Sequence, residues 1–132
     1  MTDSNNQTSI KAKLQACRSR EDTFKTLVDL SKSLIRLSPE DKTEENKIKG
    51  CESAVWLIEN KQDGVCHFRA DSDAKLMRGV LVALLSLVNG KSKEDIQAMD
   101  LANALTELNL GSYLTSSRSN GVLAILDRII AN

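Results

Sequence analysis

Residues 74–88, AKLMRGVLVALLSLV, decide the fold that we predict for this chain. After the first turn, apolar residues would cover nearly the whole circumference of a helix formed by this stretch, whereas a surface helix carries a single apolar stripe. We therefore predict a central helix that is buried on most sides and ends at Asn89-Gly90. Gly79 lies inside it, where glycine costs about 1 kcal/mol relative to alanine. Close approach of another backbone would explain the glycine.

The β-rich part of the chain comes just before this helix. A short strand is expected at about Lys47–Lys49, a second from Ser53 to about Asn60, and a third at 65–70. Asp63-Gly64 tolerates positive φ and predicts a hairpin turn between the last two. The third strand alternates, with Cys66, Phe68 and Ala70 on one face and His67 on the other, toward solvent or a helix edge. We predict a small three-stranded antiparallel sheet with one face packed on the central helix.

Gly50 and Cys51 lie between the first two of these strands. Glycine lets the backbone turn sharply, so the thiol is expected on a loop. Ser53 could satisfy nearby backbone donors before the next strand begins. A thiol on a tight turn, held by a rigid strand, suits nucleophilic or acceptor chemistry, although residue type alone favours a cysteine that only packs.

Helical segments flank the sheet in the sequence on both sides. Residues 1–8 are polar and expected to be flexible, and a short helix at 10–17 would place Cys17 in the core. A longer helix begins at a capping box at Ser19 and runs to about Leu37. Short helices capped by Ser92 and Asp100 and a terminal helix starting near Thr115 complete the prediction. An apolar stripe on each of the two long helices supports this prediction. The stripe of the helix that begins at Ser19 consists of Phe24, Leu27, Val28, Leu34 and Ile35. The stripe of the terminal helix consists of Val122, Ile125, Leu126, Ile129 and Ile130.

Acidic residues precede the central helix, at Asp71-Ser72-Asp73. We interpret them as an N-cap cluster, because the helix dipole favours negative charge there. Arg118 falls in the first turn of the terminal helix, where the dipole disfavours a cation. We therefore expect Arg118 to pair with Asp71 or Asp73.

Composition narrows the possible functions. The 132 residues suit one domain, residues 1–132, and 18 basic residues balance 18 acidic ones without a block of like charge. Nucleic acid and anionic membrane surfaces are thus not expected partners. The longest apolar run, Val80 to Val88, is too short to span a bilayer, and the polar start has no secretory signal, so we expect a cytoplasmic protein.

The cysteines and the single histidine do not have the spacing of a metal site. The sequence has three cysteines, Cys17, Cys51 and Cys66, with no CxxC pair, and one histidine, His67. Adjacent strand residues point to opposite faces, so Cys66 and His67 cannot easily share a metal. Neither a structural zinc site nor a disulfide framework is expected, and reduced thiols fit the cytosol.

Three spaced segments together resemble the SufE/CsdE family of cysteine desulfurase accessory proteins. They are residues 43–56, TEENKIKGCESAVW; residues 67–74, HFRADSDA, followed by Arg78-Gly79; and residues 114–121, LTSSRSNG. They stand in the family's order, and the similarity extends from about residue 10 to 130. The resemblance implies an α+β fold similar to the U-type cluster scaffold proteins.

The function that this resemblance implies is that of a sulfur acceptor. A pyridoxal-phosphate-dependent desulfurase, SufS- or CsdA-like, would form a persulfide, and the chain would take that sulfur on Cys51, the matching cysteine. It would stimulate the desulfurase and pass sulfur toward iron–sulfur cluster assembly, for example to a cluster scaffold. The pyridoxal phosphate belongs to the desulfurase, so the chain would need no cofactor of its own and would be an accessory protein rather than a stand-alone enzyme.

The same resemblance implies a set of residues around the acceptor. They would order the Cys51 loop and help form the docking surface for the desulfurase: Gly50, Glu52, Ser53, Asp71, Asp73 and Arg118. Lys47 and Lys49 could favour the thiolate, and Glu52 would oppose it. The sequence departs from many relatives at Glu52 and Ala54, where glutamine is common.

Two other classes of function remain open at this point. A cluster scaffold or metal-binding protein would need several converging ligands, and Cys51 has at best Cys66 or His67 to join it. A non-catalytic interaction module would use Cys51 only for packing. For Asp73 and Arg118 the alternative is a plain N-cap and a structural ion pair.

Overall fold

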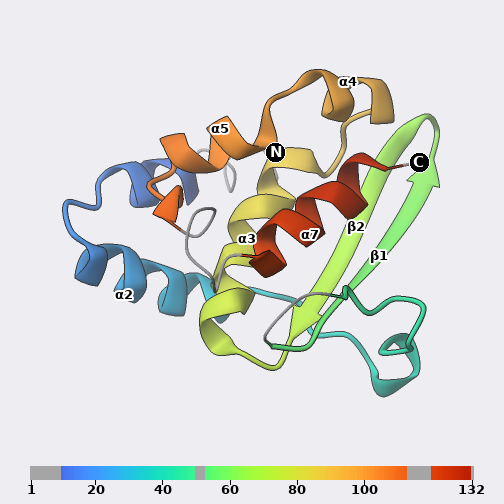
Figure 1. Cartoon of the computed structure of the whole chain (residues 1–132), viewed down its shortest axis with the longest axis horizontal. Helices are drawn as coiled ribbons and strands as arrows, with labels where there is room; N and C mark the ends of the chain where they lie inside the picture. The colour runs from blue at the N-terminus through green and yellow to red at the C-terminus, as the bar shows by residue number, and fades with distance from the viewer. Residues whose placement is uncertain (1–9, 50–52, 113–119, 132) are drawn as a thin grey trace.

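The helix α3, Lys75–Val88, lies at the centre of the molecule (Figure 1). The computed structural model describes residues 10–49, 53–112 and 120–131. In α3 the buried residues are Gly79, Val80, Leu81, Ala83, Leu84 and Val88. The helix packs on α2, Arg20–Ser31, on one side and on the sheet on another. The predicted central helix is therefore confirmed.

At Gly79 the backbone of α2 comes very close to α3. A Cβ atom built on Gly79 would collide with the backbone carbonyl of Leu27. Leu27 itself is completely buried. The expectation of a nearby backbone is thus confirmed, and the neighbour is α2.

The sheet is a single antiparallel hairpin of β1, Val55–Gln62, and β2, Val65–Ser72. Its register runs from Val55 opposite Ser72 to Gln62 opposite Val65. The turn has positive φ at Asp63 (55°) and Gly64 (82°), as its sequence predicts. The face toward α3 is apolar, as the alternation in the sequence predicts, with these buried residues: Val55, Leu57, Cys66, Phe68 and Ala70.

The described residues form two strands, and the prediction of a third was wrong. Residues before Gly50 contribute one isolated bridge, between Lys47 and Trp56. The chain comes out of a turn at that point, because the Lys47 N–H bonds to the Glu44 carbonyl at 3.3 Å. Ile48 then points into the core, with 4% of its surface exposed. Among the described residues this stretch therefore adds one bridge to β1 and no third strand.

The helix α2 is shorter than its apolar spacing predicts. It ends at Ser31 instead of about Leu37, and the hydroxyls of Ser31 and Ser33 donate to carbonyls of the last turn. Such local bonds compete with helix continuation. The predicted apolar stripe is not buried along its whole length, because Phe24 is 51% exposed and Ile35 is 84% exposed. At the other end the predicted cap is present, with Ser19 accepting a bond from the Asp22 N–H.

The second half of the chain contributes three further helices, whose buried residues belong to the same core. The helices α4, Lys93–Ala98, and α5, Leu101–Glu107, begin at the predicted caps Ser92 and Asp100. The helix α7, Asn120–Ile130, follows, and its predicted start near Thr115 lies outside the described residues. Across the described ranges, no helix is long and apolar enough to cross a membrane.

Lys93, the first residue of α4, binds both the C-terminal end of α7 and the hairpin. The Lys93 ammonium donates to the carbonyls of Ile129 (2.8 Å) and Ala131 (2.9 Å) and pairs with Glu59 of β1 at 2.9 Å. Cations at helix C-termini are favoured by the helix dipole. In Figure 1 the C-terminal end of α7 lies beside the hairpin, and α4 lies next to α7.

Candidate functional site

The site residues expected from the sequence fall into two groups. Ser53, Asp71 and Asp73 are described by the structure. Gly50, Cys51, Glu52 and Arg118 lie outside the described residues, and so does the predicted pairing of Arg118 with Asp71 or Asp73. The site can therefore be built from the residues on both sides of Gly50-Cys51-Glu52.

The two flanks of this segment are hydrogen-bonded to each other. The Ile48 N–H donates to the Val55 carbonyl at 2.8 Å, and the Leu57 N–H donates to the Asn46 carbonyl at 2.8 Å. Ile48 and Val55 also share the buried core, with exposures of 4% and 0%. Residues 49–54 therefore join two positions that are fixed to each other.

Asp71 does not cap a helix, contrary to the prediction. It belongs to β2 and lies opposite Trp56 of β1. Its carboxylate, fully buried, accepts from the Arg36 Nε at 2.7 Å and the Leu37 N–H at 3.2 Å, with the Lys42 ammonium at 3.3 Å. It thus ties the segment after α2 to the end of the hairpin beside Val55.

The surroundings of Asp71 favour its charged form. Burial alone would raise the pKa of this carboxyl. Hydrogen bonds from the Ser72 and Leu37 N–H groups and from the charged Arg36 and Lys42 outweigh burial, so the pKa is lowered. The native protein therefore holds a carboxylate there at neutral pH, neutralised by two cations.

Replacing Asp71 with asparagine is expected to reduce the free energy of unfolding by about 2 kcal/mol at pH 7. Loss of the carboxylate leaves two cations unpaired, but Arg36 is half exposed and can be hydrated, which keeps the loss below that of a fully buried pair. Because the folded pKa is depressed, wild-type stability from Asp71 is present above about pH 4 and lost as pH falls through the folded pKa.

Urea denaturation at pH 7 and pH 3 would measure the difference between wild type and Asp71→Asn. It should shrink at the lower pH. Glu21→Gln is a matched control, since the Glu21–Lys25 pair is exposed on α2 and worth under about 0.5 kcal/mol. A difference that is unchanged or larger at pH 3 would contradict a depressed pKa at Asp71.

Asp73 also differs from its predicted role. The N-cap residue of α3 is Ala74, without a side-chain capping bond, and the Asp73 side chain is exposed. Its backbone N–H donates to the Ala54 carbonyl at 3.2 Å. The same carbonyl accepts from the buried Ser72 hydroxyl at 2.7 Å. The contact between this junction and the Cys51 flank is therefore made by Ser72 and by backbone groups.

Sequence reasoning missed several residues of this arrangement. Arg36 and Lys42 bind Asp71, Lys42 also lies over the Trp56 ring at 5.1 Å, and Arg78 donates to the Ser72 carbonyl at 2.9 Å. The spacing gave no signal for Arg36, because the predicted helix placed it among ordinary surface residues. A signal did exist for Ser72, a serine between two aspartates at the start of a helix.

Of the two described cysteines, one is buried and the other half-buried, and both are hydrogen-bonded. Cys66 is completely buried, and its pKa is raised by burial, by its hydrogen bond to Glu59 and by the negative charge of Glu59. Cys17 is half-buried and bonds to the Lys13 carbonyl and to Thr26 at 3.4 and 3.3 Å. The prediction that Cys17 fills the core is met only in part.

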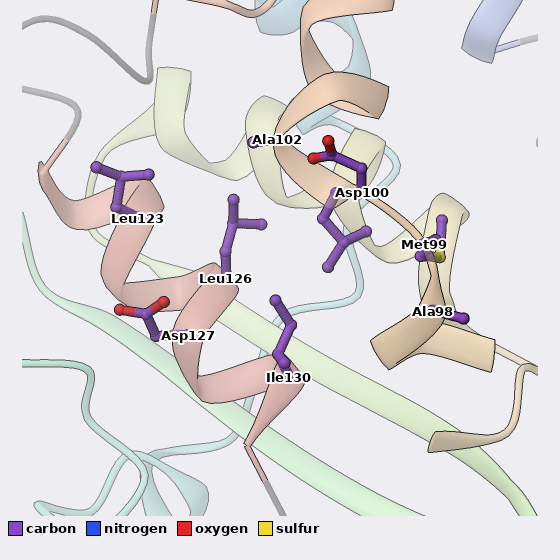
Figure 2. A pocket seen from close by; sticks show the side chains of 9 residues that line it. Ala98, Met99, Asp100, Ala102, Leu123, Leu126, Asp127 and Ile130 are labelled. Atoms are coloured by element: carbon purple, nitrogen blue, oxygen red, sulfur yellow. The ribbon is translucent and has the colours of Figure 1, made fainter. Parts of the chain in front are cut away.

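A groove lies between α7 and the chain from the end of α4 into α5 (Figure 2), and Asp71, Arg36 and Lys42 are not among its lining residues. It has a volume of about 450 Å³ and two carboxylates, Asp100 and Asp127, among apolar side chains. Such a lining does not pair a nucleophile with a base. Within the described ranges, no three His, Cys, Asp or Glu side chains converge as metal ligands.

The chain matches one protein-family model over most of its length and is similar in sequence to several known proteins. Residues 8–132 match the family model described as "SufE: Fe-S metabolism associated domain". The sulfur acceptor protein CsdE of Escherichia coli K12 is 38% identical over 112 residues, covering 84% of this chain and 76% of CsdE. An uncharacterized SufE-like protein of Rhizobium etli is 34% identical over 113 residues, covering 83% and 76%.

A solved structure has the same fold. The solution structure of a hypothetical protein from Thermus thermophilus superposes with a TM-score of 0.72, covering 95% of this chain and 90% of that one. The two sequences are 14% identical. This likeness supports the α+β architecture and carries no conclusion about chemistry.

Proposed function

The chain belongs to the SufE family of Fe-S metabolism associated domains, and from this we propose that it accepts persulfide sulfur from a cysteine desulfurase on Cys51. The observation that carries the proposal is the 38% identity to a protein named as a sulfur acceptor, over 84% of the chain. The donor is a pyridoxal-phosphate-dependent desulfurase of the SufS or CsdA type.

The transfer is a thiol–persulfide exchange. The Cys51 thiolate attacks the outer sulfur of the desulfurase persulfide. A new S–S bond forms on Cys51, the S–S bond of the donor breaks, and its electron pair stays on the desulfurase cysteine as a thiolate. No external oxidant or reductant is needed, because the sulfur atom moves with its oxidation state unchanged.

The environments of the cysteines support Cys51 as the acceptor. Exchange needs an accessible thiolate, and burial disfavours both requirements at Cys66, which is completely enclosed. Cys17 is half-buried and already hydrogen-bonded to α2 through Thr26. Cys51 is also the cysteine within the segment that resembles the family's acceptor motif.

Charges near Cys51 in the sequence would assist the reaction. Lys49 is exposed and Lys47 half-buried on the flank that leads to Gly50. Cationic neighbours stabilise a thiolate relative to a thiol, whereas the adjacent Glu52 opposes it. We propose that this mixed charge also contributes to docking of the desulfurase.

The wider role follows from the acceptor chemistry. By removing persulfide sulfur, the chain would free the desulfurase for its next turnover and so stimulate it. The persulfide on Cys51 would then serve iron–sulfur cluster assembly, in the cytoplasm, through a downstream acceptor such as a cluster scaffold. In this role the chain is an accessory protein that carries sulfur, with no cofactor of its own.

Mass spectrometry tests the proposal on the wild-type chain. After incubation with a CsdA-type or SufS-type desulfurase and free cysteine, the intact protein is expected to gain one sulfur atom. Peptide mapping should locate it on the peptide that contains Cys51. Omission of cysteine is the control for sulfur acquired by other routes. Added sulfur on Cys17 or Cys66 instead, or none with either desulfurase, would refute the proposal.

A further inference from the structure

We propose that Ser72 is a positioning residue for the sulfur-accepting segment, acting through its hydroxyl bond to Ala54. The inference rests on the proposed function of Cys51. Ala54 is three residues after Cys51 in the chain. The resemblance implied a role at the acceptor for the segment Asp71–Asp73, and the residues named within it were the two aspartates rather than Ser72.

The bonding of Ser72 fits a fixed anchor. Its side chain is completely enclosed, and its hydroxyl donates to the Ala54 carbonyl at 2.7 Å while accepting from the Ala74 N–H at 3.2 Å. Both functions of the hydroxyl are therefore used, which sets its rotamer. Polar groups this deeply buried are costly unless bonded, so Ala54 is held where Ser72 can reach it.

The junction that carries Ser72 is itself rigid. The Ser72 N–H donates to the Asp71 carboxylate at 2.8 Å, and Arg78 of α3 donates to the Ser72 carbonyl at 2.9 Å. Ser72 is thus connected to the Asp71 cluster on one side and to the central helix on the other. Because Ser72 is held in place on both sides, its hydrogen bond restrains the position of the Ala54 carbonyl.

Neither neighbouring aspartate can take the place of this bond. The Asp71 carboxylate is directed to Arg36, Leu37 and Lys42, on the segment after α2. Asp73 reaches Ala54 through its backbone N–H, at the longer distance of 3.2 Å, and that contact is independent of its side chain. Among the described residues, the Ser72 hydroxyl is therefore a side-chain group that holds the Ala54 carbonyl, on the C-terminal flank of the acceptor segment.

Positioning matters for the exchange, because the attacking and leaving sulfur atoms must align in the complex with the desulfurase. A misplacement of the order of 1 Å can lower a rate by up to about 100-fold. For Ser72→Ala we expect a loss of about 10-fold, since the Asp73 N–H and the Ile48–Val55 bond still restrain the flank.

The experiment measures single-turnover sulfur transfer to Cys51 at saturating concentrations of a persulfide-loaded desulfurase. For Ser72→Ala the transfer rate constant should fall about 10-fold, and the Kd for the desulfurase should not change. Ser72→Thr keeps the hydroxyl and is expected to restore most of the rate. Ser31→Ala is the matched control, since Ser31 is also buried and its hydroxyl donates to a backbone carbonyl, that of Val28, within α2.

The split between rate and affinity separates positioning from a purely structural role. If Ser72→Ala transfers sulfur as fast as Ser31→Ala, or if only the Kd rises, Ser72 does not position the acceptor. If Ser72→Thr folds but stays as slow as Ser72→Ala, the hydroxyl is not responsible, and the inference again fails. Wild-type protein that acquires no sulfur would instead overturn the proposed function, and the inference with it.

Discussion

Replacing Cys51 with serine should reduce desulfurase turnover, in the presence of this protein, to the rate of the desulfurase alone. A hydroxyl cannot replace the thiolate that attacks the persulfide, since the nucleophile in the exchange is an ionised sulfur. Steady-state assays of alanine or sulfide production from cysteine measure the effect. Because Cys51 precedes the buried core residues of β1, the variant should keep the fold, which circular dichroism would verify.

The other two cysteines provide the controls for this result. Cys17→Ser changes a half-buried thiol and should leave stimulation intact. Cys66→Ala removes a buried thiol and should lower stability while leaving sulfur transfer intact, because the cavity is small. Full stimulation by Cys51→Ser would refute the acceptor assignment. Stimulation that survives without sulfur on any cysteine would favour an interaction module.

Much of the fold could be predicted because one signal dominates it. Apolar residues around most of the 74–88 helix require neighbours on several sides, and α2 and the hairpin provide them. The alternation of Cys66, Phe68 and Ala70 sets which face of β2 is buried, and Asp63-Gly64 sets the turn. These are local patterns with one physical solution.

The errors arose where contacts between distant residues outweigh local pattern. The apolar spacing of Leu34 and Ile35 continues the α2 stripe, yet the chain leaves the helix at Ser31. Asp71, which is about 35 residues away in the sequence, binds Arg36 and the Leu37 N–H. No periodicity within a helix encodes a buried carboxylate on a distant strand.

In the candidate site, too, the local pattern identified the right stretch of sequence, whereas the contacts between distant residues could not be predicted. The sequence identified Asp71 and Asp73 as important but assigned both to a helix cap, because acidic residues before a helix usually act there. In the fold β2 extends through Ser72, so Asp71 faces the segment after α2 and Ser72 faces Ala54. Which of three adjacent polar residues makes the contact depends on strand register, and the expected end of the strand at Ala70 was two residues too early.

Replacing Gly79 with alanine should lower the free energy of unfolding by about 3 kcal/mol. The added Cβ would overlap the Leu27 carbonyl, and that atom belongs to the backbone of α2, so no side-chain rotation can relieve the clash. The two helices would have to separate, which exposes fully buried Leu27 and Leu81. The better helix propensity of alanine returns only about 1 kcal/mol of the loss.

Urea denaturation measures this change, and Gly90→Ala separates its cause from ordinary glycine effects. Gly90 has φ of +83° and no atom within 4 Å of an added Cβ. That variant should therefore lose only about 1 kcal/mol, from backbone strain.

If Gly79→Ala were as stable as wild type, the contact between α2 and α3 could not be as close as described. A large loss at Gly79 with a small one at Gly90 would instead show that the glycine is required by the packing of α2 on α3. The same packing fixes the start of the segment after α2 that reaches Asp71, so the variant should also weaken the hydrogen bonds from Arg36 and Leu37 to Asp71.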